Sequence, residues 1–252
     1  MARTSTARNL RRLIAERDES RGLLIAFEGP DGSGKTTQRK LLKTWLESRG
    51  NTVVSTRWAS SALVKPLLKV RKRIRTLSTE EYSLLHAVDF RHRLETSILP
   101  ALWEGKTVLA DRYLFTALAH DAARGLDLDW LLHAYSPLLW PDLVIYFSMT
   151  AEDSSRRVAS ARAPRFYEAG QDVTGLEDPL ASYGRFVDRV VTEYENLALI
   201  FKFVTVDAGD AVYRQHTQVR ELVESTEKRP WPAFSREAVE EWLKKSSRAA
   251  TS

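Results

Sequence analysis

The stretch FEGPDGSGKTTQ, residues 27–38, constrains the fold of this chain more than any other feature. The apolar run GLLIAFE leads into it, and TTQRKLLKTWLESRG follows with its apolar residues at helical spacing. A buried strand that ends in a glycine-rich turn and continues as a helix is the first half of a βαβ unit. NTVVSTR, residues 51–57, supplies the second strand. The order predicts parallel strands joined by a helix.

Three further apolar runs have the length of strands: KTVLADR (106–112), PDLVIYFSM (141–149) and FKFVTVDA (201–208). Two helical patterns, 61–75 and 79–105, separate the second run from the third; Thr79 is a plausible start and Gly105 a plausible stop for the longer one. Strands that alternate with helices predict an α/β fold, with a five-stranded parallel sheet and helices on both faces.

The composition excludes several classes of protein. The 252 residues contain no cysteine, so disulfides, thiolate nucleophiles and cysteine-ligated metals are excluded, and a cytoplasmic location fits. No apolar run reaches membrane-spanning length, so no membrane partner is expected. The net charge of +5 is gathered locally, at the N-terminus and in KPLLKVRKRIR. A basic surface also suits an enzyme whose substrates carry phosphates, so nucleic-acid binding is not expected as the main function.

Three segments are predicted. Residues 1–20 form a basic N-terminal extension, in which Glu16, Asp18 and Glu19 favour a surface helix over a transit peptide. Residues 21–228 form the main domain. Residues 229–252 open with the linker RPWPAFS, and a short amphipathic helix capped by Ser235 follows it.

The turn between the first strand and its helix matches G-x-x-x-x-G-K-[ST] in full. Glycines let the backbone N–H groups turn inward around phosphate oxygens, and the helix N-terminus adds partial positive charge. Lys35 can reach the β and γ phosphates, and the Thr36 hydroxyl can bind Mg²⁺. We therefore expect a nucleoside triphosphate to be held by Gly29, Pro30, Asp31, Gly32, Ser33, Gly34, Lys35, Thr36 and Thr37.

The third strand ends at Asp111, and Arg112 follows it. Ligands of parallel sheets bind at the carboxyl ends of the strands, so both side chains are expected at the site. Asp111 would join Thr36 in a Mg²⁺ site, as acidic residues do after strands of this class. The alternative is a salt bridge at the end of the strand.

A second group of cations lies in SSRRVASARAPRFYE, residues 154–168. A segment that closes over phosphates needs mobile cations to neutralise the transferring group. Arg162 and Arg165 flank Pro164 in the loop-like part, which favours that role for them. For Arg156 and Arg157 the favoured interpretation is a solvated basic helix.

In their order, FEGPDGSGKTTQ, ADRY with AARGL, PDLVIYF and the arginine-bearing segment resemble the thymidylate kinases, over about residues 22–208. The resemblance implies a P-loop kinase fold with a small lid at about 156–175. It implies transfer of the γ-phosphoryl group of ATP, with Mg²⁺, to the 5′-phosphate of dTMP, giving dTDP and ADP.

The resemblance also implies roles for individual residues. The loop carries Gly32 where some members have an arginine, so the chain resembles the members whose lid supplies that charge. The implied catalytic residues are Lys35, Arg112, Arg162 and Arg165. Asp31 is expected to approach the 3′-hydroxyl of the acceptor sugar.

The pocket for the acceptor departs from the family pattern. The family's R-E-P-G-G-T is Arg57-Trp-Ala-Ser-Ser here, and its stacking aromatic and later arginine become His86 and Phe90. Asp121 replaces a glutamine; a carboxylate only accepts hydrogen bonds, so it suits thymine N3–H and equally a cytosine amino group. The expected acceptor contacts are Asp31, Arg57, His86, Phe90, Arg112, Thr116 and Asp121.

Two other functions stay open at this point. A kinase of a different nucleoside monophosphate, such as dUMP or CMP, would keep the same machinery with another base pocket. A non-catalytic P-loop nucleotide-binding module is disfavoured, because a module without turnover has no use for a mobile basic lid. A homodimer formed through the long helix from Thr79 is compatible with the sequence.

Overall fold

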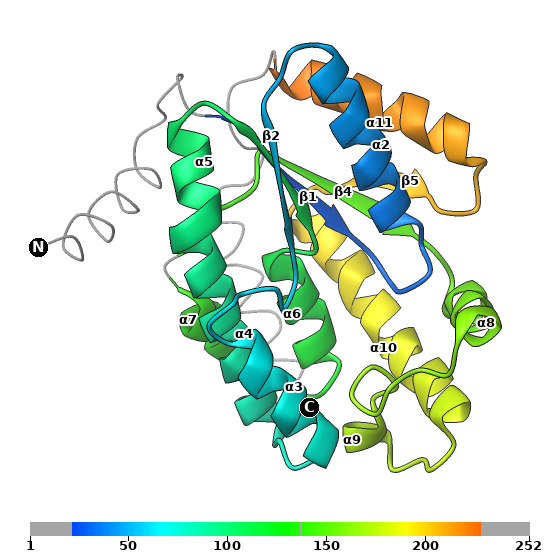
Figure 1. Ribbon diagram of the computed structural model, residues 1–252. Helices are drawn as coiled ribbons and strands as arrows, with labels where there is room; N and C mark the ends of the chain where they lie inside the picture. The colour runs from blue at the N-terminus through cyan, green and yellow to red at the C-terminus, as the bar shows by residue number, and fades with distance from the viewer. Residues whose placement is uncertain (1–21, 137, 228–252) are drawn as a thin grey trace, which may run out of the picture.

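The computed structural model describes residues 22–136 and 138–227. Its five strands are β1 (Leu24–Glu28), β2 (Val53–Arg57), β3 (Thr107–Asp111), β4 (Leu143–Ser148) and β5 (Val204–Asp207). They form one parallel sheet in the order β2-β3-β1-β4-β5 (Figure 1). The predicted five-stranded parallel sheet is confirmed. The N-terminal extension and the helix expected from Ser235 lie outside the described residues, and the division into segments stays a prediction.

Helices cover both faces of the sheet, as the alternation of elements predicts. The described helices are α2 (Lys35–Ser48), α3 (Lys65–Ile74), α4 (Thr79–Arg93), the π-helix η1 (Leu94–Ile98), α5 (Leu99–Trp103), α6 (Leu114–Ala122), α7 (Leu128–Tyr135), α8 (Ala151–Ala161), α9 (Gln171–Thr174), α10 (Pro179–Ile200) and α11 (Val212–Glu227). In Figure 1, α2 and α11 lie together on one face, while α4, α6 and α10 lie on the other. Among the described residues, no helix is both long enough and apolar enough to cross a membrane.

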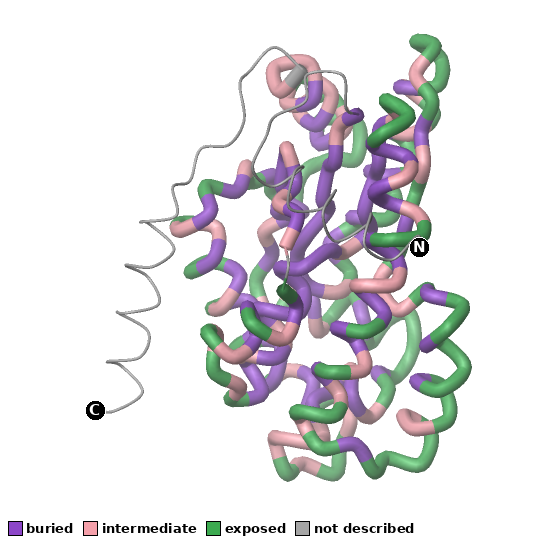
Figure 2. Tube along the Cα trace, turned by 90° about the vertical axis from the view of Figure 1, so that its left-hand side faces the viewer, coloured by how far each residue is buried: buried purple, intermediate pink, exposed green. Residues whose placement is uncertain are grey.

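The central strand β1 is buried along its whole length, because both of its faces are covered. Leu24 and Ala26 belong to the core under α4, α6 and α10, and Ile25 and Phe27 belong to the core under α2 and α11. Figure 2 shows the strands as a buried layer between half-exposed helices. β3 and β4 flank β1 on opposite sides, so the strand order changes direction at β1. In parallel sheets such a point leaves a crevice at the carboxyl ends of the strands.

The predicted helix 79–105 is observed as α4, η1 and α5, which follow one another without a gap, so that one π turn lies between two α-helical parts. Ser78 and Glu81 form a capping box at its start, and the helix ends at Trp103. Pro100 lacks an N–H, and its ring conflicts with the carbonyl four residues earlier. The π turn η1 comes just before this proline. In it the Leu99 N–H donates to the Leu94 carbonyl, five residues back, which is the wider spacing of a π turn.

A buried carboxylate on α4 holds the loop that follows β2. Asp89 is 0% exposed; it accepts hydrogen bonds from the backbone of Ala59 at 3.1 Å and of Ser61 at 2.7 Å, and from Arg93 Nε at 2.8 Å. Three donors on one buried carboxylate offset the cost of removing its charge from water. The loop after β2, and Trp58 within it, is thereby placed beside the crevice.

We expect Asp89→Ala to lower the free energy of unfolding by about 3–5 kcal/mol, because the Arg93 guanidinium would be left buried and unpaired. Chemical denaturation followed by circular dichroism measures this change. Glu95→Ala is the matched control: its pair with Arg91 lies on the same run of helix but is partly exposed, and its loss should change the value by less than about 0.5 kcal/mol. Equal effects of the two substitutions would contradict this account.

Candidate active site

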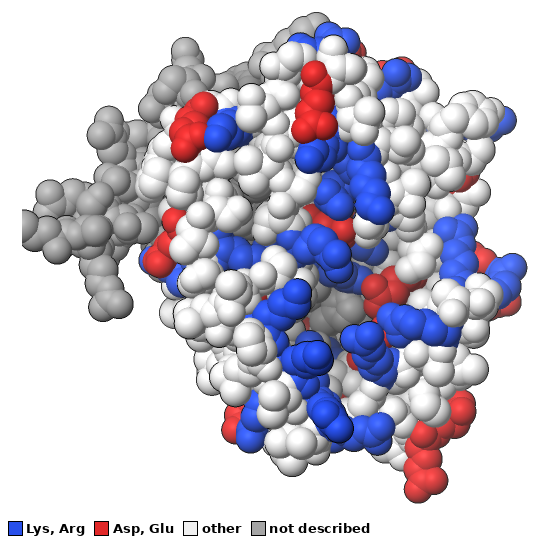
Figure 3. All heavy atoms as spheres, in the orientation of Figure 1, with Lys and Arg blue, Asp and Glu red and all other residues white. Residues whose placement is uncertain are grey.

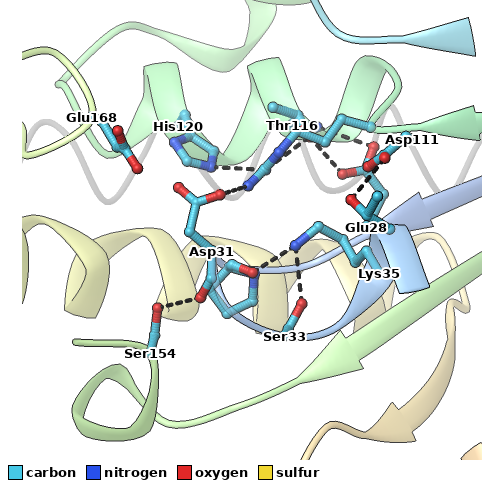
Figure 4. A network of polar contacts seen from close by, with 12 residues as sticks. Glu28, Asp31, Ser33, Lys35, Asp111, Thr116, His120, Ser154 and Glu168 are labelled. Carbon is cyan, nitrogen blue, oxygen red and sulfur yellow. Dashed lines mark hydrogen bonds and ion pairs between the residues drawn. The ribbon is translucent and has the colours of Figure 1, made fainter. Parts of the chain in front are cut away.

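The loop between β1 and α2 has the geometry that phosphate binding requires. Gly29 has φ +135°, and a Cβ there would lie 2.6 Å from the Phe147 carbonyl oxygen. Gly34 is the N-cap of α2 with φ +85°. Only glycine adopts such angles at little cost, so the loop can curl with its N–H groups inward. Lys35 Nζ donates to the Pro30 carbonyl at 2.6 Å and to Ser33 Oγ at 2.9 Å (Figure 4).

The two residues predicted to bind a metal lie side by side. Thr36 Oγ1 donates to Asp111 Oδ2 at 2.8 Å, and Arg39 Nε lies 3.4 Å from the same oxygen. A hydroxyl and a carboxylate at the edge of a phosphate loop fit Mg²⁺, which takes one or two protein oxygens and keeps waters and phosphates as its other ligands. Among the described residues there is no cluster of three or more acidic, histidine or cysteine side chains suited to a metal ion.

Arg112 joins the phosphate loop to the end of β3. Its NH2 donates to Asp31 Oδ1 at 2.5 Å, and its NH1 lies 3.3 Å from His120 Nε2. Burial opposes ionisation of Asp31, but the charges of Arg112 and Lys35 outweigh it and lower the pKa of Asp31. Burial, Arg112 and other nearby cations hold the pKa of His120 well below its usual value, so the ring is neutral and its Nε2 accepts a hydrogen bond from Arg112 NH1.

Sequence reasoning missed Glu28, which fixes the backbone behind Arg112. Its carboxylate is 0% exposed and accepts from the Tyr113 N–H at 2.8 Å, Thr116 Oγ1 at 2.6 Å and Tyr194 Oη at 3.0 Å. Burial raises the pKa of Glu28, and these hydrogen bonds oppose the shift. The sign of this role in the sequence is that Glu28 is an acidic residue at the end of an otherwise apolar strand.

A cavity of about 790 Å³ lies next to the loop. Seven cations line it: Lys65, Lys69, Lys72, Arg73, Arg75, Arg112 and Arg165. The acids on its wall are Asp31, Asp121 and Glu168. In Figure 3 the blue side chains gather around a hollow in this part of the molecule. The excess of positive charge suits a polyanionic ligand.

Most of the residues predicted to contact the acceptor line this cavity. They are Asp31, His86, Arg112, Thr116 and Asp121, together with Arg165 from the lid. Thr116 Oγ1 lies 3.4 Å from Arg112 NH1, within the Glu28 network.

Two of the predicted contacts lie elsewhere. Phe90 is 0% exposed and packs in the core against Tyr113 and Tyr135, so it does not face the cavity. It lies one helical turn after His86 on α4, on the side that meets the sheet. Arg57 is exposed and lines a separate depression with His92.

Aromatic side chains wall the inner end of the cavity, and the sequence did not single them out. Trp58 stacks on His86 with ring centroids 5.8 Å apart, and Tyr82 meets His86 at 4.3 Å. His86 Nδ1 lies 2.8 Å from the Tyr82 carbonyl, and Lys72 Nζ lies 3.1 Å from Nε2. A carbonyl only accepts, so Nδ1 carries the proton and Nε2 accepts from Lys72. Burial and Lys72 hold the pKa of His86 well below its usual value, which keeps the ring neutral.

The two predicted lid arginines differ in their surroundings. Arg162 is exposed and holds Glu168 with both of its terminal nitrogens, at 2.7 and 2.9 Å. Arg165 lines the cavity, and among the described residues its guanidinium has no ion-pair partner. Arg156 pairs with Asp153 on the exposed side of α8, as a solvated helix predicts.

Arg157 is also exposed on α8, as a solvated helix predicts, but it makes two contacts that the sequence did not indicate. Its guanidinium donates to the Gly32 carbonyl at 3.1 Å and to the Ala208 carbonyl at 3.0 Å. It therefore ties α8 to the phosphate loop and to the turn after β5. A Cβ on Gly32 would approach Arg157 Cβ to 3.0 Å, so glycine permits this approach.

The lid segment is docked against the domain through Tyr167 and Arg124. Tyr167 Oη accepts from the Leu77 N–H at 2.9 Å, and its ring stacks on Tyr82 at 5.1 Å. Arg124 is 8% exposed; it donates to the Tyr167 carbonyl at 2.5 Å and to Asp172 Oδ2 at 3.0 Å. The lid predicted as a mobile loop is packed in this structure on α4 and on the turn after α6.

The chain is similar to known proteins over the segments that form this site. The family model described as thymidylate kinase matches residues 27–176. A probable thymidylate kinase 2 of Saccharolobus solfataricus is 38% identical over 206 residues, 81% of this chain and 96% of its own length. A probable thymidylate kinase of Thermococcus gammatolerans is 36% identical over 215 residues, 81% of this chain and 96% of its own. One of Pyrococcus horikoshii is 41% identical over 144 residues, 55% and 70% respectively.

We expect binding of a nucleoside triphosphate to take up a proton at Lys35. Burial and Arg112, partly offset by Asp31 and Asp111, lower the pKa of free Lys35 to about 7, and bound phosphates would raise it again. Below pH 7 the ammonium is already charged, so this group adds no pH dependence. As the pH rises above 7, affinity should fall by at most about tenfold per pH unit.

Calorimetric titration at pH 8 in two buffers of different ionisation enthalpy measures this uptake. Lys35→Arg is the control, because a guanidinium stays charged throughout this range. Uptake that is absent from the original chain, or equal in the two proteins, would contradict the prediction.

Proposed function

This chain belongs to the thymidylate kinase family, and on that premise we propose that it transfers the γ-phosphoryl group of ATP to the 5′-phosphate of dTMP, giving dTDP and ADP. One observation carries the proposal. Asp31 lies in the phosphate loop, Arg112 follows the end of β3, and Arg112 NH2 donates to Asp31 Oδ1 at 2.5 Å. Both residues also line the cationic cavity. A γ-phosphate held by the loop would therefore face a second phosphate in the cavity.

The reaction needs no general base, because the second pKa of a phosphate monoester lies near 6 and the acceptor is largely dianionic at neutral pH. The obstacle is repulsion between two polyanions. At an effective dielectric constant of 20, two unit charges about 4 Å apart repel by roughly 4 kcal/mol, and several such pairs meet here. Catalysis is therefore positioning together with charge neutralisation.

Lys35 and Arg112 supply the fixed part of that neutralisation. Lys35 has only neutral partners in the loop, Pro30 and Ser33, and can exchange them for phosphate oxygens. Arg112 is held by Asp31 and His120, with the Glu28 network behind it. Mg²⁺, which Thr36 and Asp111 would hold, would shield the charge of the ATP phosphates.

Within the lid we assign the charge-neutralising role to Arg165. Its guanidinium lines the cavity without a counter-ion among the described residues, whereas Arg162 is already held by Glu168. An unpaired cation beside the transferring group is available to the transition state at no cost of breaking an ion pair. We also assign to Asp31, which lines the cavity, the role of accepting a hydrogen bond from the acceptor sugar.

Coupled ADP release with a panel of monophosphates tests the proposed function. We expect kcat/KM to be highest for dTMP and lower for dUMP, CMP and GMP. Preference for one of the other acceptors would establish the alternative kinase. Absence of turnover with every acceptor would leave only a nucleotide-binding module.

Arg165→Ala should lower kcat by about 10²–10³-fold with a smaller change in KM, because its contact forms mainly in the transition state. Arg162→Ala should lower kcat by less than about tenfold. Steady-state kinetics with dTMP measure both. Arg156→Ala is the control for loss of an exposed lid charge and should change neither constant. The assignment is wrong if Arg162→Ala has the larger effect on kcat.

A homodimer stays a prediction, and we place its contact on the exposed side of α4. Leu84 and Val88, one helical turn apart, are 46% and 50% exposed there. Apolar side chains at such spacing are typical of helix–helix contacts. Sedimentation equilibrium should give a dimer for the original chain and a monomer for the Leu84→Asp, Val88→Asp double variant. A monomer in both cases would contradict the prediction.

A further inference from the structure

The inner end of the cavity presents one buried hydrogen-bond acceptor with a full charge. Asp121 on α6 is 2% exposed, lines the cavity, and lies 3.8 Å from the Arg124 guanidinium. Of the other two acids on the wall, Asp31 is held by Arg112 and Glu168 by Arg162. Asp121 lies at the aromatic end of the cavity, because the charge of Lys72, which lies over the Tyr82 ring, acts on its carboxylate.

The same end presents one donor with a full charge. Lys72 on α3 lies 3.1 Å from His86 Nε2 and 4.6 Å from the centre of the Tyr82 ring, and no acid among the described residues pairs with it. An ammonium has three N–H groups; His86 takes one and Tyr82 Oη, at 3.4 Å, takes a second, so one stays available to a ligand. His86 itself cannot donate to a ligand, because its only N–H is directed to the Tyr82 carbonyl. Lys72 is the remaining cationic donor at this position.

We propose that Asp121 and Lys72 read the base of the acceptor as a pair. Asp121 accepts the N3–H of a 4-keto pyrimidine, and Lys72 donates to the O4 carbonyl beside that N3–H, where cytosine has an amino group. The inference rests on the proposed function and adds the residues that select the base. Neither residue alone makes the selection, because a carboxylate would also accept from a cytosine amino group.

Cytosine opposes this pair of side chains. Its N3 carries a lone pair in place of a hydrogen. Cytosine N3 and the Asp121 carboxylate would then be two facing acceptors with no proton between them. A buried site that offers a hydrogen-bonding group rejects the analogue that cannot use it far more strongly than an apolar pocket rejects a change of size. The aromatic walls, Trp58 and His86, add stacking area that is common to both bases.

The decisive measurement is the ratio of kcat/KM for dTMP to that for dCMP. Asp121→Asn keeps the shape, and its amide can present either an oxygen or an NH₂ group to N3, so the ratio should fall by about 10–100-fold. Lys72→Met keeps most of the side chain without the donor and should lower kcat/KM for dTMP by about 10–100-fold, with a smaller effect on dCMP. Lys69→Met removes a charge from the same helix and cavity and should leave the ratio within about twofold.

The ratio also has a pH signature, from which the titration of the acceptor phosphate cancels because both substrates share it. Burial, opposed by Arg124, raises the pKa of Asp121 to about 6. Above pH 6 the carboxylate accepts from N3–H; below it the protonated carboxyl can donate to cytosine N3, so the ratio should fall from pH 7.5 to pH 5.5. The charged or titratable groups that act on Asp121 are Arg124 in the turn after α6, Lys72 on α3, Tyr135 on α7 and Asp172 on α9, and Tyr82 on α4 lines the same cavity.

The outcomes separate this inference from the function on which it rests. Turnover of dTMP with a ratio that neither Asp121→Asn nor Lys72→Met changes would overturn the base-reading pair and leave the proposed function standing. If Lys72→Met lowers the ratio no more than Lys69→Met does, Lys72 acts only as a general positive charge, and the base-reading pair is also overturned. If the original chain does not phosphorylate dTMP at all, the proposed function fails and this inference fails with it.

Discussion

A single buried carboxylate, Glu28, holds together the parts on which the site depends. It closes the central strand β1 and binds the backbone of Tyr113, the hydroxyl of Thr116 and the phenol of Tyr194. These partners come from the turn after β3, from α6 and from α10. Arg112 precedes this anchored turn with φ +70°, a backbone angle that a non-glycine residue keeps only when its neighbours are fixed. The direction of Arg112 toward Asp31 is therefore a consequence of where Glu28 is buried.

The charges of the cavity are arranged for phosphates rather than for the stability of the empty protein. Cations from α3, β3 and the lid outnumber the acids around one hollow, and several of them lack counter-ions among the described residues. Like charges gathered around a hollow repel one another, so the fold bears a cost that only a polyanion relieves. This arrangement accounts for how a P-loop fold of the thymidylate kinase family binds two phosphorylated ligands together.

Local patterns predicted the sheet because strand length, glycine turns and helical spacing are properties of neighbouring residues. The phosphate loop was predictable for the same reason, since Gly29 through Thr36 act as one contiguous unit. The residues predicted to contact the acceptor gather at the cationic cavity only in part. His86 and Asp121 line the cavity, but Phe90, one turn beyond His86, lies in the core. Helical spacing tells which residues share a face, but not how deep along that face the cavity ends.

By itself the sequence determined the fold class, the nucleotide loop and the family, because each is carried by residues close together in the chain. Only the tertiary structure decided which charges are available. Arg162 and Arg165 are alike in sequence, yet Glu168 holds one and leaves the other to face the cavity. Arg157 is exposed as expected, yet it also reaches the carbonyls of Gly32 and Ala208 from distant segments. Lys72 meets His86 across two helices. The state of a charged side chain depends on its partners in space, and those partners are set by the packing of the whole domain.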